Sequence, residues 1–215
     1  MSYYFPEGTK LYYSVTFAAT KTITALSNAS PAAATSTSHG YVDDDEILMV
    51  SGWEDATDTV YMVDQTDANT FSVLGLDASN TSFYPAGTGT GTASKVSSWV
   101  EVPQLLDLST SGGDVRLTTI SPLAKRNDIQ VATGFNATAL NFTLGHDPAN
   151  ATYIAMLGIS RTLTKVALKV LISGSAPMYG YGYMSVSEMP RMARNQANQV
   201  AGTITMLGRP IAYGS

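Results

Sequence analysis

The chain has no cysteine and only two histidines among its 215 residues. Without cysteine there is no disulfide, no thiolate metal site and no thiol nucleophile, and nothing indicates an oxidising compartment. A metal site or catalytic triad would have to use His39 or His146, or rely on carboxylates alone. The sequence therefore excludes disulfide scaffolds and thiol enzymes, and the fold must depend on packing and hydrogen bonds.

Charged residues and long apolar runs are also scarce. Charged residues make up 13% of the chain, and Gly, Ser, Thr and Ala are abundant. This composition argues against a disordered acidic tail and favours a β protein with many turns. No stretch approaches the roughly 20 apolar residues that span a bilayer, and the first residues do not resemble a secretory signal. We expect a soluble protein that stays where it is made and has no membrane partner.

The charge is distributed unevenly along the chain. Residues 21–95 hold ten acidic and two basic side chains, whereas the remainder holds seven acidic and ten basic ones. Such a change of sign suggests two units with different surroundings. Length alone leaves open whether the chain forms one large domain or two small ones.

Alternating apolar and polar residues predict several strands. Residues 10–18 and 140–144 show the period of two that is typical of half-buried strands. Short β-type runs between residues 46 and 76 predict a compact meander, followed by a flexible Gly- and Thr-rich return that ends near Lys95. We therefore expect a domain boundary near Lys95.

Two later segments have informative patterns. Residues 165–172 place apolar side chains on one face and Lys165 and Lys169 on the other, which predicts a strand with one core face and one solvent face. In residues 178–187, tyrosines alternate with Gly180 and Gly182. This pattern fits either a close approach on the glycine side or a bend.

Only one helix is expected. In residues 146–158, Asp147 can cap the helix, Pro148 suits its first position and Gly158 can end it.

Residues 109–134 are weakly patterned and exceed an ordinary connection, so we expect a functional loop there. The predicted fold class is mainly β, a β-sandwich or barrel with one flanking α-helix.

The sequence offers little for catalysis or tight ligand binding. His39 precedes an acidic run, Asp43, Asp44, Asp45 and Glu46, whose oxygens could hold calcium, but the spacing does not fit an EF-hand loop. A solvated acidic turn is the preferred interpretation. The twelve basic residues do not cluster with aromatic ones, which is unfavourable for gripping nucleic acid. We expect no catalytic residue, no cofactor and no metal.

The order of elements in residues 1–20 and 96–215 resembles the major tail tube proteins of lambda-like siphophages. The resemblance rests on the first strand and on later segments, in order WVEVPQLLDL, a long segment with TTIS, FNATALNFTL, DPANATYIAML, LTKVALKVLIS, MYGYGYMSVSEMP and QVAGTITMLGRP. It implies a structural virion protein, assembled in the host cytoplasm, whose hexameric rings stack into the tail tube used for DNA ejection. Implied partners are further copies of the chain, the tape measure protein, and the tail terminator and distal tail proteins, while DNA passes without specific binding.

Residues 21–95 resemble a second family, the small β-barrel related to the first catalytic cysteine half-domain of ubiquitin-activating enzymes. The matching segments are SHGYVDDDEILMVSGW, TFSVLGLD and FYPAGTGTGT. The resemblance implies an inserted all-β barrel domain, which we expect on the outside of the tube, and a structural role for His39. Without cysteine, no ubiquitin chemistry is implied.

The resemblance also suggests which residues act in assembly. Residues 109–134 occupy the place of the family's long loop, which reaches a neighbouring ring. The implied intersubunit contacts are made through charge-assisted bonds by Arg116, Lys125, Arg126 and Asp128. An electronegative lumen, along which DNA would slide, would draw on Glu101, Asp107 or Glu188.

A binding module is the alternative. In that hypothesis the acidic barrel is a tail adhesin or carbohydrate-binding module that recognises the host surface, with Trp53 and Tyr61 as exposed aromatic platforms. The competing interpretation places both residues in the barrel core. An enzyme is the least favoured class.

Overall fold

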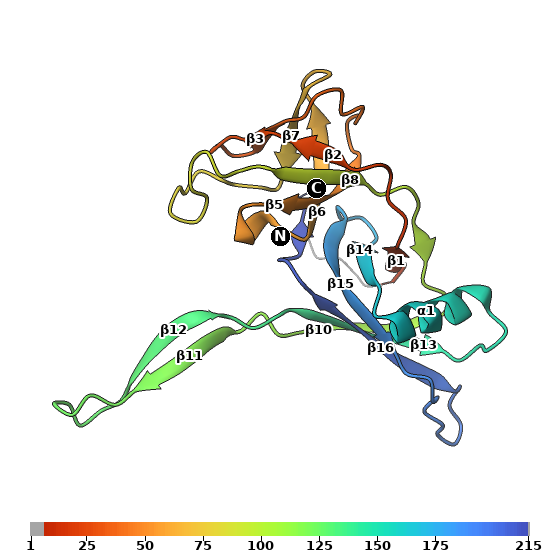
Figure 1. Ribbon diagram of the computed structural model, residues 1–215. Helices are drawn as coiled ribbons and strands as arrows, with labels where there is room; N and C mark the ends of the chain where they lie inside the picture. Colours follow the sequence, from red (N-terminus) through yellow and green to blue (C-terminus); the bar gives the residue numbers. More distant parts are fainter. Residues whose placement is uncertain (1–6, 215) are drawn as a thin grey trace.

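Two large antiparallel sheets, one long hairpin and one α-helix make up most of the computed structural model, which describes residues 7–214 (Figure 1). The expected fold class, mainly β with one helix, is confirmed. No helix among residues 7–214 is long and apolar enough to cross a membrane.

The larger sheet, here called the body sheet, has eight strands in the order β10-β13-β16-β15-β14-β1-β9, with β17 paired to β15. Its strands are β1 (Lys10–Ser14), β9 (Val100–Glu101), β10 (Leu105–Ser111), β13 (Ala139–Gly145), β14 (Lys165–Leu171), β15 (Met178–Val186), β16 (Gln199–Met206) and β17 (Ile211–Ala212). Alternation in β13 buries Leu140, Phe142 and Leu144, as the period of two predicted.

The second sheet, here called the insert sheet, has seven strands in the order β2-β8-β5-β6-β7-β4-β3. Its strands are β2 (Lys21–Ile23), β3 (Ala25–Leu26), β4 (Ala32–Thr35), β5 (Glu46–Ser51), β6 (Thr59–Gln65), β7 (Thr70–Leu74) and β8 (Gly91–Lys95), and a short 3-10 helix, η1 (Glu54–Ala56), follows β5. Because β8 lies between β2 and β5, the expected flexible return is wrong for residues 91–95.

The single helix, α1 (Ala151–Thr162), begins and ends later than the sequence suggested. Asn150 caps it, since its side-chain oxygen accepts hydrogen bonds from the amides of Thr152 and Tyr153 at 2.9 and 3.1 Å. Asp147 instead accepts from the amide of Ala149 in the preceding turn. The helix continues through Gly158 and packs Tyr153 and Met156 into the core of the body sheet.

His39 has a structural role in the insert core. Its side chain is 2% exposed, with Nδ1 accepting from the amide of Tyr41 at 3.0 Å and Nε2 lying 2.9 Å from the carbonyl oxygen of Asp67. Because a carbonyl only accepts, the proton lies on Nε2.

The nearby acidic turn is not fully solvated as expected, since Asp45 is buried and pairs with Lys95 at 2.5 Å.

A mixed ionic and aromatic cluster joins the two sheets. Oε1 of Glu46 accepts from Nζ of Lys169 at 2.6 Å and from the hydroxyl of Tyr179 at 2.8 Å, while Oε2 accepts from Nε1 of Trp99 at 2.8 Å. Burial, and then the charge of Glu46, raise the pKa of Tyr179 above its ordinary value. The expected solvent face of β14 is therefore wrong, because the insert covers it and Lys165 also pairs with Asp58.

The C-terminal segment also contacts the insert and joins it to the body sheet. The hydroxyl of Tyr213 accepts from the amide of Met62 and donates to the carbonyl of Leu74, both at 2.8 Å. Gly208 approaches the insert so closely that a Cβ there would lie 2.2 Å from Oγ1 of Thr59. These contacts hold the insert against the body sheet in one orientation.

The glycines of β15 mark a close approach rather than a bend. A Cβ on Gly182 would lie 2.0 Å from the carbonyl oxygen of Thr205, and one on Gly180 would lie 2.6 Å from the sulfur of Met206. Strand β16 therefore packs directly on the glycine positions, and any larger residue would push it away.

We predict opposite effects for two glycine-to-alanine substitutions. Gly182→Ala should lower the free energy of unfolding by about 1–3 kcal/mol, because the methyl group meets backbone that cannot yield. Gly158→Ala, which meets nothing within 4 Å in the middle of α1, should raise it by roughly 0.5–1 kcal/mol. Urea unfolding of both variants measures this, and equal effects would contradict the assignment of a close approach.

Candidate assembly interface

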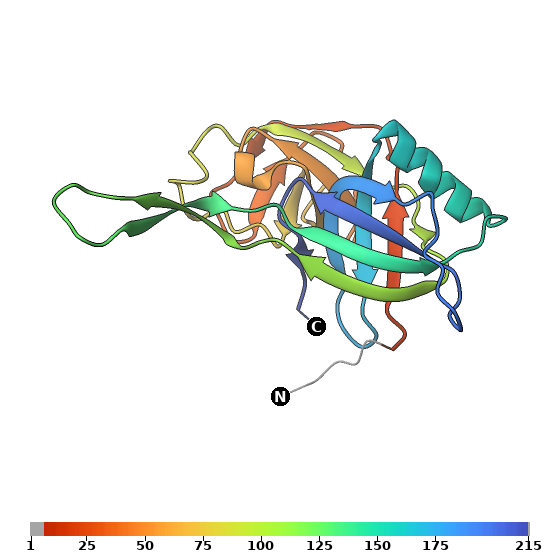
Figure 2. The same ribbon diagram turned by 90° about the horizontal axis from the view of Figure 1, so that it is seen from below.

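A two-stranded hairpin projects away from both sheets (Figure 2). It consists of β11 (Val115–Ile120) and β12 (Ile129–Phe135), paired in a register from Val115↔Phe135 to Ile120↔Ile129. The expectation of a loop over residues 109–134 is therefore wrong as to secondary structure, while the functional role expected of this segment stays a prediction. Strand β10 extends into this range up to Ser111, and most of the remainder is a regular antiparallel ribbon.

The hairpin carries large apolar side chains that the described part of the chain leaves partly or fully exposed. They are 38–108% exposed and comprise Val115, Leu117, Ile120, Leu123, Ile129, Val131 and Phe135. Apolar side chains exposed in this number on one projecting element mark an interaction site. An isolated two-stranded ribbon is also marginally stable in water. Both facts indicate that the hairpin functions in contact with another molecule.

The apolar side chains change faces along the hairpin. Directly paired residues share a face, so Val115, Leu117 and Phe135 lie together near the root. Ile120 and Ile129 lie together on the other face near the tip. A bulge beside Arg116, with a positive φ of 146° at Gly134, lies within the root region, between the Val115–Phe135 and Leu117–Ala132 pairs. Covering the whole hairpin therefore requires contacts on both of its faces.

Three of the four predicted contact residues lie together at the tip. Lys125, Arg126 and Asp128 are exposed in the turn between the two strands, where Asp128 accepts from the hydroxyl of Ser121 at 2.7 Å. Arg116 lies nearer the root, and its Nε donates to Oγ1 of Thr133 at 3.3 Å. Within residues 7–214, none of these four charged groups forms a salt bridge.

The three predicted lumen residues are not brought together. Glu101 lies in edge strand β9 and pairs with Lys10 at 3.2 Å. Glu188 follows β15 and pairs with Arg161 at 2.7 Å, and this hydrogen bond lowers the pKa of Glu188. Asp107 lies exposed in β10, at the opposite edge of the sheet, and makes no salt bridge to any described residue.

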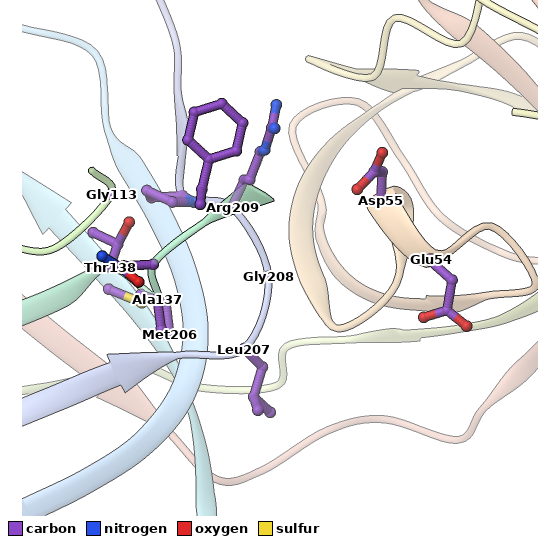
Figure 3. Close-up of a pocket in the computed structure, with 12 residues that line it drawn as sticks. Glu54, Asp55, Gly113, Ala137, Thr138, Met206, Leu207, Gly208 and Arg209 are labelled. Carbon is purple, nitrogen blue, oxygen red and sulfur yellow. The ribbon is translucent and has the colours of Figure 1, made fainter. Parts of the chain in front are cut away.

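A groove that the sequence did not reveal lies at the root of the hairpin (Figure 3). Its volume is about 570 Å³, and its walls come from η1, from residues 135–138 and from residues 206–210. The guanidinium of Arg209 lies 5.1 Å from the ring centre of Phe135 on one wall. Figure 3 shows Glu54 and Asp55 on the opposite wall. The Gly-Arg-Pro of residues 208–210, which the sequence marked only as the end of the closing strand, forms part of the groove wall.

The predicted aromatic platforms of a binding module are buried. Trp53 is 1% exposed and Tyr61 is 2% exposed. The interpretation of these residues as a sugar-binding surface is therefore wrong, and both belong to the insert core.

Among residues 7–214, no group of three or more histidine, aspartate or glutamate side chains is arranged to hold a metal ion.

The chain matches the model of a known protein family. The model of the family described as phage tail tube protein matches residues 51–215. The matched region contains the hairpin, the groove, the helix and all of the body sheet except β1. No curated protein matches the chain.

We predict that the hairpin is protected from hydrogen exchange only in assemblies. In the dilute single chain, amides of β11 and β12 should exchange with a free energy of opening near zero, whereas those of β13–β16 should exchange far more slowly. Hydrogen-exchange mass spectrometry at low and high protein concentration measures this. Slow exchange of the hairpin in the dilute chain would show that it needs no partner.

Proposed function

Because the chain belongs to the phage tail tube protein family, we propose that its copies form hexameric rings that stack into the tail tube of a lambda-like siphophage. The family makes it a structural component of the virion tail. The ring of six, the stacking and the passage of DNA during ejection are taken from the resemblance in the order of elements. In this proposal the chain has no catalytic function.

The exposed hairpin is the observation that carries the proposal. Covering one large apolar side chain is worth about 1.5–3 kcal/mol, so several of them supply a strong drive for association. Lys125, Arg126 and Asp128 add charge-assisted hydrogen bonds at the tip, which fix the direction and register of the contact. A neighbouring copy is the partner that a self-assembling tube provides.

The edges of the body sheet also support a closed ring. Strands β10 and β9 end the sheet, and neither edge has a further partner in the part of the chain that the structure describes. Unpaired edges invite uncontrolled pairing unless another strand covers them. Closure into a ring gives each copy a neighbour on both sides.

We propose that residues 1–20 and 96–215 form the tail tube domain and that residues 21–95 are an inserted barrel on the outside of the tube. In support, the chain leaves and re-enters the body side by side, with Phe17 bridged to Val96. The acidic insert then lies away from the DNA path. Its kinship with the small half-domain of ubiquitin-activating enzymes is part of the same proposal.

Asp107 is the strongest candidate for the electronegative lumen, because Glu101 and Glu188 each have a basic partner. An electronegative lumen would let DNA slide past without specific binding. The remaining partners in the proposal are the tape measure protein inside the tube and the tail terminator and distal tail proteins at its ends. Assembly takes place in the host cytoplasm.

The adhesin alternative loses its support because its aromatic platforms are buried.

We predict that Arg126→Glu impairs tube formation without unfolding the protein. Reversing the charge removes a charge-assisted bond worth roughly 1.5–3 kcal/mol, so the critical concentration should rise about tenfold or more. Electron microscopy and sedimentation over a concentration series measure this. Arg194→Glu, at another exposed arginine without a salt bridge among the described residues, is the control. Normal tubes from Arg126→Glu would refute the assigned contact.

We also predict that a peptide tag inserted at Gly87 is accessible on assembled tubes. Gly87 lies in an exposed turn of the insert and has nothing within 4 Å of its Cβ position. Immunogold labelling along the tube wall tests this, because an antibody is too large to enter a narrow lumen. Labelling of disassembled protein only would place the insert inside or between subunits.

A further inference from the structure

We propose that the groove beside η1 receives the hairpin tip of a second copy of the chain. The inference rests on the proposed function, in which copies associate through the hairpin, and it names the acceptor surface. The groove lies at the root of each hairpin, so every copy would offer a tip and receive one.

The charges of the tip and the groove are complementary. The tip carries two positive groups and one negative group, namely Lys125, Arg126 and Asp128. The groove carries two negative groups and one positive group, namely Glu54, Asp55 and Arg209. None of the six forms a salt bridge within residues 7–214, and each charged group of the tip has a counterpart of opposite sign in the groove. Such complementary patterns determine register and exclude wrong partners.

The apolar parts also fit each other. Leu123 at the tip is 108% exposed, so its side chain is fully open to solvent. The groove presents the exposed side chains of Phe135 and Leu207, with Pro210 beside them. Inserting Leu123 would remove water from the groove, which strengthens the surrounding charge pairs. The contact therefore combines an apolar centre with a charged rim, as protein interfaces commonly do.

The hairpin cannot fill its own groove. It leads away from its root along two paired strands of six and seven residues, each rising about 3.3 Å per residue. The tip thus lies roughly 20 Å or more from the groove, and Figure 1 shows the hairpin extended away from the insert. A contact between different surfaces of two copies repeats from copy to copy, and it yields a closed ring or an open helical array.

The insert becomes part of the assembly surface in this arrangement. Glu54 and Asp55 belong to η1 of the insert, whereas Arg209 belongs to the turn that follows β16. The close approach of Gly208 to Thr59 holds these two walls in a fixed relation. An insert that only decorated the outside of the tube would not need to supply a wall of this groove.

Cross-linking between two engineered cysteines tests the contact directly. The chain has no native cysteine, so Asn127→Cys at the tip and Asn136→Cys in the groove provide the only thiols and leave all six charges intact. Mild oxidation of assembled protein should produce a ladder of linked oligomers on a non-reducing gel. The control pair, Asn127→Cys with Asn198→Cys, should stay monomeric. A ladder from the control pair alone, or tubes without any ladder, would overturn the proposal.

Charge exchange provides an independent test. Asp55→Lys and Arg126→Glu should each raise the critical concentration for assembly about tenfold, and the double variant should return it to within roughly threefold of wild type. Asp64→Lys, an exposed insert residue outside the groove, should change nothing. If tubes form but the double variant raises the critical concentration by the product of the two single effects, the groove is not the acceptor surface. If the wild-type chain forms no ring or tube, the proposed function fails as well.

Discussion

The carboxylate of Glu46 fixes the relation between the two sheets, and the geometry of the groove depends on that relation. Removing an ion pair from water is costly unless further hydrogen bonds satisfy its remaining atoms. Here Lys169, Tyr179 and Trp99 together satisfy both oxygens of Glu46. A network with these directional requirements is met in one orientation only, so it specifies how the insert sits on the body.

The junction between the sheets is rigid, whereas the projecting hairpin is adaptable. These two properties complement each other. A groove whose walls are already fixed loses little conformational freedom when a partner binds. A ribbon with few contacts of its own can adjust its twist as it docks, and its ordering cost falls when the apolar side chains are covered. The chain thus joins a preorganised acceptor to an adaptable donor. This combination favours assembly between copies over folding back of the hairpin onto its own chain.

The sequence predicted features that arise from local patterns and missed those that arise from distant contacts. Alternation in β13 identified a strand correctly because one face meets a core and the other does not. The hairpin escaped detection because Leu117 and Ile120 lie on opposite faces, which destroys the period of two. Lys169 was assigned to solvent because its partner, Glu46, lies in another sheet. The groove combines three separate segments, so no window of sequence contains it.

The uneven charge along the chain has a structural explanation. Two cations of the body, Lys165 and Lys169, pair with acidic residues of the insert, so part of the charge difference holds the two sheets together. Lys10 and Arg161 are paired within the body. The basic residues of the body that lack a salt bridge to any described residue lie on the hairpin, in the turn after β16 and between β15 and β16, namely Arg116, Lys125, Arg126, Arg191, Arg194 and Arg209. Salt bridges thus neutralise four cations of the body within the chain, and those of the hairpin tip and the groove are the ones proposed to meet a second copy.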